Sequence, residues 1–241
     1  ISPERDVPLK NASVLIENGK ITRVSNQSIK PTNNTRVVDA SNLYLTPGLM
    51  DSHLHTLVMP GLGFIGGERS KIFAQMTSLY QQQLERSLLY HGVTQILDPA
   101  AHPSALKRSR SRDLTPDIFH CGAAPLANGY PALLMDRSAI EETLPYRIYQ
   151  GTPDRFKPEH IDLSQHTPEA VVERMRKDGA ICLKLFFEDG WDMANHWPML
   201  NDESLKRVIT AAHKAKLKVI AHANALDLSL IHISEPTRPL H

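Results

Sequence analysis

From residue 49 onward, apolar strands alternate with amphipathic helices, and this alternation limits the chain to a small set of folds. The predicted strands are 49–55, 93–98, 117–122, 181–187 and 218–222. The predicted helices lie between them, over 69–91, over 104–112, from Thr167 to Gly179 and from Asn201 onward. Such strand–helix–strand repeats are typical of a parallel sheet. The sequence therefore predicts an α/β fold.

The number of repeats favours a partial (β/α)8 TIM barrel. A closed barrel needs eight strands and about 250 residues. Only five strand–helix steps are visible here, over residues 48–227, so we predict strands 1–5 of 8. An open doubly wound sheet is the alternative, but no glycine-rich phosphate loop follows any of the strands.

The first 47 residues have a different pattern, in which short strands are joined by turns. Strands at 12–17 and 20–24 flank Asn18-Gly19, a strong hairpin signal, and a further strand is predicted at 36–39. We predict that residues 1–47 are the N-terminal part of a small β-sandwich domain, followed by the barrel over 48–227.

Both ends of the chain are unusual. Residues 228–238, Leu-Ser-Leu-Ile-His-Ile-Ser-Glu-Pro-Thr-Arg, match the translation of a transposon-end sequencing adapter. We expect residues 228–241 to be a non-native tail, with a natural proline-containing loop as the alternative. The chain begins at Ile1 without a methionine, so we expect the true N-terminus and any signal peptide to be missing. We call the product of the uninterrupted gene the parent protein.

The composition excludes several classes of protein. With 41% hydrophobic and 22% charged residues, the chain is neither disordered, fibrous nor membrane-spanning. A formal net charge of +1 gives no field that attracts nucleic acid, and we interpret the basic run at 107–112 as a solvated helix face. We expect a small-molecule substrate, no nucleic-acid or membrane partner, and leave a homo-oligomer of the parent protein open.

Two cysteines, Cys121 and Cys182, are too few for a disulfide scaffold. We interpret both as buried thiols of a reducing compartment, which favours the cytoplasm. A single bridge between them is the alternative. Export stays open, because the true N-terminus is expected to be missing.

A histidine pair follows Pro47-Gly48 at the start of the predicted barrel. Alternate side chains of a strand share a face, so His53 and His55 present two imidazoles side by side, as one metal ion requires. The spacing alone is a weak signal, because a chain with 12 histidines contains such pairs by chance.

A lysine in the middle of an apolar strand strengthens the metal interpretation. Burial of the Lys184 ammonium costs several kcal/mol unless it is paired or neutralised. A neutral lysine amine reacts with CO₂ to give a carbamate, an anion that bridges two divalent metals. The alternative is that Lys184 reaches solvent at the strand end. His222 ends another predicted strand, and its alternative is a hydrogen-bonded core histidine.

Residues at three strand ends gather at one face of a barrel, where catalytic groups lie. The motifs are the hairpin Ile16–Ile21, Pro47-Gly48, Asp51-x-His53-x-His55, Lys184, and His222 after Ala211-Ala212-His213. With these motifs, the sequence from about residue 10 to 227 resembles the amidohydrolase superfamily, and within it the imidazolonepropionase-like metal-dependent hydrolases.

The resemblance implies two divalent metal ions, with Zn²⁺ as the preferred metal. It implies that His53 and His55 bind the more buried ion, that Lys184 bridges both as a carbamate, and that His222 binds the more exposed ion. The family also uses a histidine of strand six and a catalytic aspartate of strand eight. Neither is present, so we predict no catalytic residue in this fragment and expect it to be inactive. We interpret Asp51 as a supporting or structural residue.

The implied reaction of the parent protein is hydrolysis of an amide or peptide-like C–N bond by a metal-bridging hydroxide, with a dipeptide or cyclic amide as substrate. Loops after the strands would contact that substrate, and Tyr130 and Trp191 are the candidates. The alternatives are a mononuclear deaminase of the same superfamily, which typically lacks the strand-four lysine, a non-catalytic scaffold, and a broken reading frame without function as written.

Overall fold

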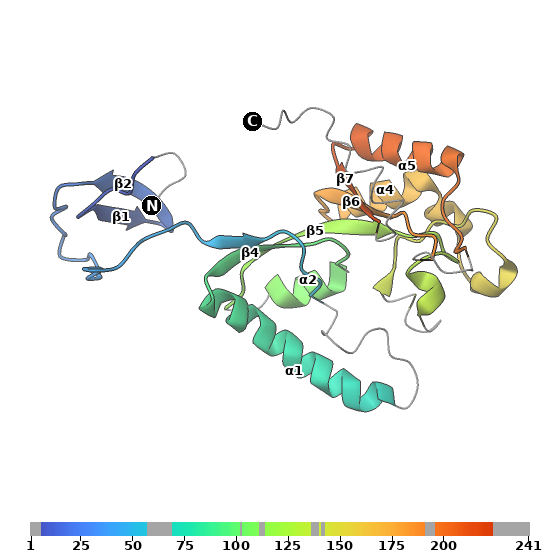
Figure 1. Cartoon of the computed structure of the whole chain (residues 1–241), viewed down its shortest axis with the longest axis horizontal. Helices are drawn as coiled ribbons and strands as arrows, with labels where there is room; N and C mark the ends of the chain where they lie inside the picture. The colour runs from blue at the N-terminus through green and yellow to red at the C-terminus, as the bar shows by residue number, and fades with distance from the viewer. Residues whose placement is uncertain are drawn as a thin grey trace. The chain divides into compact units, whose positions relative to one another are not determined.

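The structure is a computed structural model that describes residues 6–56, 69–101, 103–110, 114–135, 140, 143–190 and 196–223. The described residues fall into two compact units, one up to Leu49 and the other from Met50 onward. Figure 1 shows the elements of both units along the chain. Within the described ranges, no helix combines the length and the apolar character needed to cross a membrane.

The first unit contains an antiparallel hairpin of β1 (Ser13–Glu17) and β2 (Lys20–Ser25), as predicted. Asn18 and Gly19 in its turn have φ angles of 52° and 74°, the left-handed values that favour these residue types. The strand predicted at 36–39 is wrong. Val37 and Val38 are exposed, and no strand of this unit's described part pairs with them to form a ladder.

The second unit is built on a five-stranded sheet. Its strands are β3 (Leu49–Asp51), β4 (Val93–Asp98), β5 (Asp117–Ala124), β6 (Cys182–Phe186) and β7 (Lys218–His222). Their order in the sheet is the order in the chain, and the pairs β4–β5, β5–β6 and β6–β7 are parallel. A doubly wound sheet reverses its strand order at a switch point. The strand order therefore supports the predicted partial barrel over the open sheet.

Helices connect the strands at the predicted places. They are α1 (Arg69–Tyr90), α2 (Pro103–Arg110), α4 (Pro168–Lys177) and α5 (Asp202–Lys214), with short 3-10 helices at Ala132–Leu134, Asp154–Phe156 and Leu163–His166. The Thr167 hydroxyl accepts a hydrogen bond from the Ala170 amide, and the Asn201 side chain accepts one from the Ser204 amide. Both predicted N-caps thus begin their helices.

The sheet has one face against helices and one face that carries polar residues. Leu183 and Leu185 of β6 belong to the core with side chains of α4 and α5, among them Val171, Met175, Val208 and Ala212. Because side chains alternate along a strand, Cys182, Lys184 and Phe186 project from the opposite face. We call this the inner face of the sheet.

A glycine lets β5 approach α4 closely. A Cβ atom on Gly122 would lie 2.3 Å from the Met175 Cγ, so a larger residue would push the helix away. Gly122 therefore faces the helix layer. Its neighbours Cys121 and Ala123 project from the inner face, in register with Cys182 and Lys184.

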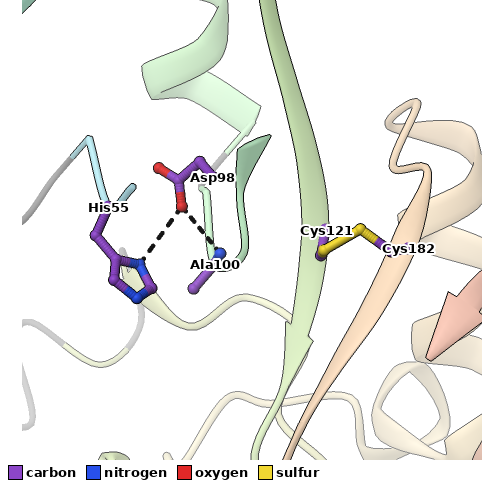
Figure 2. Close-up of a disulfide and its surroundings, with 5 residues drawn as sticks. All are labelled: His55, Asp98, Ala100, Cys121 and Cys182. Carbon is purple, nitrogen blue, oxygen red and sulfur yellow. Dashed lines mark hydrogen bonds and ion pairs between the residues drawn. A yellow bond between two sulfur atoms is a disulfide. The ribbon is translucent and has the colours of Figure 1, made fainter. Parts of the chain in front are cut away.

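The two cysteines form a disulfide, so the interpretation as two reduced thiols is wrong and the alternative of a single bridge is correct. Cys121 and Cys182 are register partners on β5 and β6, and their Cα atoms are 4.3 Å apart (Figure 2). Their separation of 61 residues in sequence conceals this pairing, which depends on strand register. The bridge removes the argument for a reducing compartment.

Candidate metal centre

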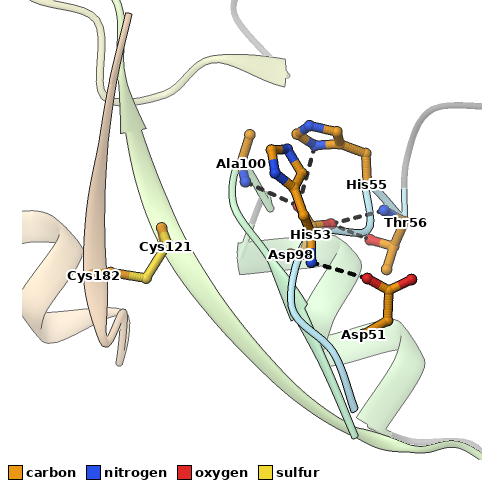
Figure 3. A network of polar contacts seen from close by, with 8 residues as sticks. All are labelled: Asp51, His53, His55, Thr56, Asp98, Ala100, Cys121 and Cys182. Carbon is orange, nitrogen blue, oxygen red and sulfur yellow. Dashed lines mark hydrogen bonds and ion pairs between the residues drawn. A yellow bond between two sulfur atoms is a disulfide. The ribbon is translucent and has the colours of Figure 1, made fainter. Parts of the chain in front are cut away.

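The histidine pair lies just past the end of β3, and the strand predicted over 49–55 is shorter than expected. β3 ends at Asp51, whose Oδ1 accepts a hydrogen bond from the His53 amide at 3.0 Å. The Leu54 amide still donates to the Leu97 carbonyl at 3.1 Å, so the segment continues along β4. The rings of His53 and His55 remain neighbours, with centroids 5.4 Å apart (Figure 3).

Asp98, at the end of β4, holds His55 in place. Its Oδ1 lies 3.5 Å from the His55 Nδ1, and the carboxylate is only 1% exposed. Its Oδ2 accepts hydrogen bonds from the Thr56 amide at 2.8 Å and the Thr56 hydroxyl at 2.7 Å, and its Oδ1 accepts one from the Ala100 amide at 2.9 Å (Figures 2 and 3). The Nε2 of His55 is therefore the nitrogen that a metal can use.

The same contacts keep Asp98 ionised. Burial opposes the charged form, but the hydrogen bonds from His55, Thr56 and Ala100 outweigh it and lower the pKa of Asp98. The sequence analysis missed this residue. Its one signal was an acidic residue at the end of a predicted strand, the position where barrel strands carry functional groups.

Lys184 is buried on the inner face, in register with Ala123 of β5 and Ile220 of β7. Only 3% of it is exposed, so it does not reach solvent at the strand end. Burial lowers the pKa of its ammonium group. This shift favours the neutral amine, which is the form that reacts with CO₂.

His222 ends β7 opposite Phe186 and is within electrostatic reach of the other three residues. Burial lowers the pKa of His222, and the charge of Lys184 lowers it further. The pKa of His53 is lowered by the same two causes in the same order. The four residues predicted as metal ligands thus face one region, and two of the imidazoles are held in the neutral form that metal binding requires.

The donor atoms are of types that bind divalent metals, but they lie in pairs. His53 adjoins His55, and His222 adjoins Glu188, whose Oε2 is 3.8 Å from the His222 Nε2. In the part of the chain that the structure describes, no three His, Cys, Asp or Glu side chains lie close enough to hold one ion. Imidazole nitrogen and carboxylate oxygen are ordinary zinc ligands.

Aromatic rings line the region beside His222. The Tyr130 ring lies 4.8 Å from the His222 ring and 5.9 Å from the Phe186 ring, measured between centroids, and stacks on Trp197 at 5.6 Å. Burial raises the pKa of Tyr130, and the charge of Glu188 raises it further. Tyr130 was predicted from the sequence as a substrate contact, whereas Trp197 was not. Trp191 lies outside the described residues.

No protein-family model and no curated protein matches the chain. Solved structures do match it. An amidohydrolase superposes with a TM-score of 0.60 at 20% identity, over 89% of this chain and 52% of that chain. A prolidase in complex with N-methylphosphonate-L-proline superposes with a TM-score of 0.62 at 16% identity, over 88% of this chain and 51% of that chain. The chain has the amidohydrolase fold. The ochratoxinase of A. niger shares this fold, with a TM-score of 0.60 at 19% identity, over 95% and 55%.

These matches confirm the fold that the resemblance implies. The chain spans about half the length of the amidohydrolases that it matches, which agrees with a sheet of five strands where a complete barrel has eight. At these identities the likeness establishes the architecture. The chemistry of the site has to be argued from its own residues.

If His55 binds zinc in the parent protein, as the resemblance implies, replacement of Asp98 by asparagine is expected to weaken this binding about 10- to 100-fold. An amide has a single acceptor oxygen, so its NH₂ group must face one of the donors that now bind Asp98, and His55 loses its orientation. A chelator competition assay measures the zinc dissociation constant. Asp117→Asn, an exposed change at the opposite end of the neighbouring strand, is the control. Equal zinc affinity in Asp98→Asn and wild type would contradict this role.

Proposed function

We propose that the parent protein is a metal-dependent amidohydrolase that hydrolyses an amide or peptide-like C–N bond in a small molecule. The observation that carries this proposal is the electrostatic interaction of His53 and His222 with each other and with His55 and Lys184, residues that lie at or near the carboxyl ends of β3, β6 and β7. Barrel enzymes carry their chemistry at this edge of the sheet.

In this proposal each residue has a defined task. His53 and His55 would hold one divalent ion, His222 would hold the other, and Lys184, as a carbamate, would be a ligand of both. When bound, the two ions supply an activated water and polarise the substrate carbonyl. Asp98 orients His55. The lowered pKa of Lys184 supports the binuclear hydrolase over a mononuclear deaminase, because the carbamate forms from the neutral amine.

The proposed substrate is a dipeptide-like amide. The rings of Tyr130, Phe186 and Trp197 form an aromatic cluster beside His222, which we propose to pack against an apolar group next to the scissile bond. A prolidase is among the solved structures with this fold, and this likeness supports the proposal of a peptide-like bond in the substrate. Tyr130 is the residue we propose to contact the substrate directly.

Metal analysis tests the binuclear proposal. The purified parent protein, dialysed against trace zinc, is expected to return about two equivalents of zinc per chain by elemental mass spectrometry. Removal of the metal by a chelator should abolish hydrolysis of dipeptides, and re-addition of zinc should restore it. A folded preparation with a single equivalent would instead favour the mononuclear deaminase. A folded, metal-free preparation would favour the non-catalytic scaffold.

A further inference from the structure

We propose that Glu188 is an additional metal ligand, which binds the same ion as His222. The proposal rests on the function proposed above and extends its metal site by one carboxylate. Neither the sequence motifs nor the resemblance to the amidohydrolases places a ligand at this position.

The backbone brings Glu188 to the end of the neighbouring strand. β6 ends at Phe186, but the Phe187 amide donates a hydrogen bond to the His222 carbonyl at 2.8 Å. The parallel ladder between β6 and β7 therefore continues one residue past the strand. Glu188 follows directly, at the carboxyl edge of the sheet, where His222 ends β7 and where His53 and His55 follow β3.

Glu188 is a buried acid in a setting that favours a cation. Only 1% of the residue is exposed, and a buried carboxylate costs several kcal/mol unless positive charge or hydrogen bonds compensate it. Its charge raises the pKa of Tyr130, which places the carboxylate beside the ring that borders His222. A divalent ion between Glu188 and His222 would add a favourable interaction with that charge, beside the contacts that Glu188 already makes.

The distance between the two side chains fits two ligands of one ion. The Glu188 Oε2 lies 3.8 Å from the His222 Nε2, which is too long for a hydrogen bond, and this Nε2 is buried without a hydrogen-bond partner. Two ligands that are each about 2.1 Å from a zinc ion lie roughly 3.4 Å apart in a tetrahedral site, and further apart at wider angles. The observed spacing needs only a small adjustment.

His222 and Glu188 are two ligands, and the proposed ion needs at least a third. Among the described residues, no set of three His, Cys, Asp or Glu side chains surrounds one point. Lys184, on the inner face two residues before Phe186, lies within electrostatic reach of His222. As a carbamate it would complete a set of His222, Glu188 and Lys184, and the added carboxylate would help this set to retain its ion.

Glu188→Gln in the parent protein tests the proposal, because glutamine keeps the shape of the side chain and removes its charge. We expect zinc content after dialysis to fall from about two equivalents to about one, since the pair His53 and His55 is untouched. With cobalt in place of zinc, the visible absorption spectrum should change, because one of the two sites loses a ligand. Asp189→Asn is the matched control: Asp189 adjoins Glu188 but faces His196 at 3.5 Å, and the variant should keep both metals.

The outcomes separate this proposal from the proposed function. Two equivalents and an unchanged cobalt spectrum in Glu188→Gln would overturn the ligand role, while the amidohydrolase proposal stands. A wild-type protein without metal would overturn both. If Glu188→Gln does not fold, Glu188→Asp replaces it: a ligand role predicts two sites, one of them with weakened zinc affinity, and unchanged affinity at both would overturn it.

Discussion

Replacement of Lys184 by alanine is expected to lower kcat/KM of the parent protein at least about a thousandfold, which corresponds to about 4 kcal/mol of transition-state stabilisation. Lys184 is 3% exposed on the inner face, and burial lowers its pKa, so the structure favours an amine that can become a carbamate. Without it, the proposed site would lose the carbamate that we propose as a ligand of both ions.

A rescue experiment distinguishes a carbamate from a lysine cation. Short carboxylic acids such as acetate or propionate carry the same oxygen pair as a carbamate, and they should partly restore activity and metal content to Lys184→Ala. Ammonium or alkylamine salts should not. Lys218→Ala, an exposed change at the start of β7, is the control and should behave as wild type. Full activity in Lys184→Ala would show that the lysine has no part in the reaction.

Local signals predicted most of the elements well. The strand expected at 218–222 is β7, with the same bounds, because an apolar run between a helix end and a polar segment has few alternatives. The helices after Thr167 and Asn201 begin where their N-caps satisfy free backbone amides. These features depend on a few neighbouring residues, and a single sequence contains them in full.

Features that depend on strand register were not predictable in the same way. Asp98 meets Thr56 across 42 positions in sequence, and Cys121 meets Cys182 across 61. Neither pair has a local signal, because the contact exists only once β3, β4, β5 and β6 are aligned. A metal-ligand role for Glu188 was not predicted for a related reason: the residue follows its strand in a segment without periodicity, and the proposed role depends on its position beside the neighbouring strand.

Only part of the candidate site could be predicted from the sequence, and the reason is physical. His53, His55, Lys184 and His222 each stand out against an apolar strand, so the sequence displays them directly. The residues that orient or complement them are ordinary acids in the sequence. Burial gives such acids their effect, and burial is a property of the assembled sheet.

Removal of the disulfide is expected to be the largest change in stability that a conservative substitution can make in this sheet. In the double variant Cys121→Ala and Cys182→Ala, a loop closed across 61 residues is released, which lowers the free energy of unfolding by about 4 kcal/mol. For a unit of this size, the melting temperature should fall by roughly 10 °C. Differential scanning calorimetry of the parent protein measures this change.

Reduction of the disulfide provides the controls. A reductant should lower the melting temperature of the wild type toward that of the double variant, and it should leave the double variant unchanged. Peptide mapping without reduction should recover a fragment that links Cys121 to Cys182, and its absence would contradict the bridge. Cys182 lies two residues before Lys184 on the inner face, so the double variant also tests the candidate site. If the bridge aligns β5 with β6, its removal should lower zinc affinity together with stability. If the bridge only restricts the unfolded chain, its removal should lower stability alone.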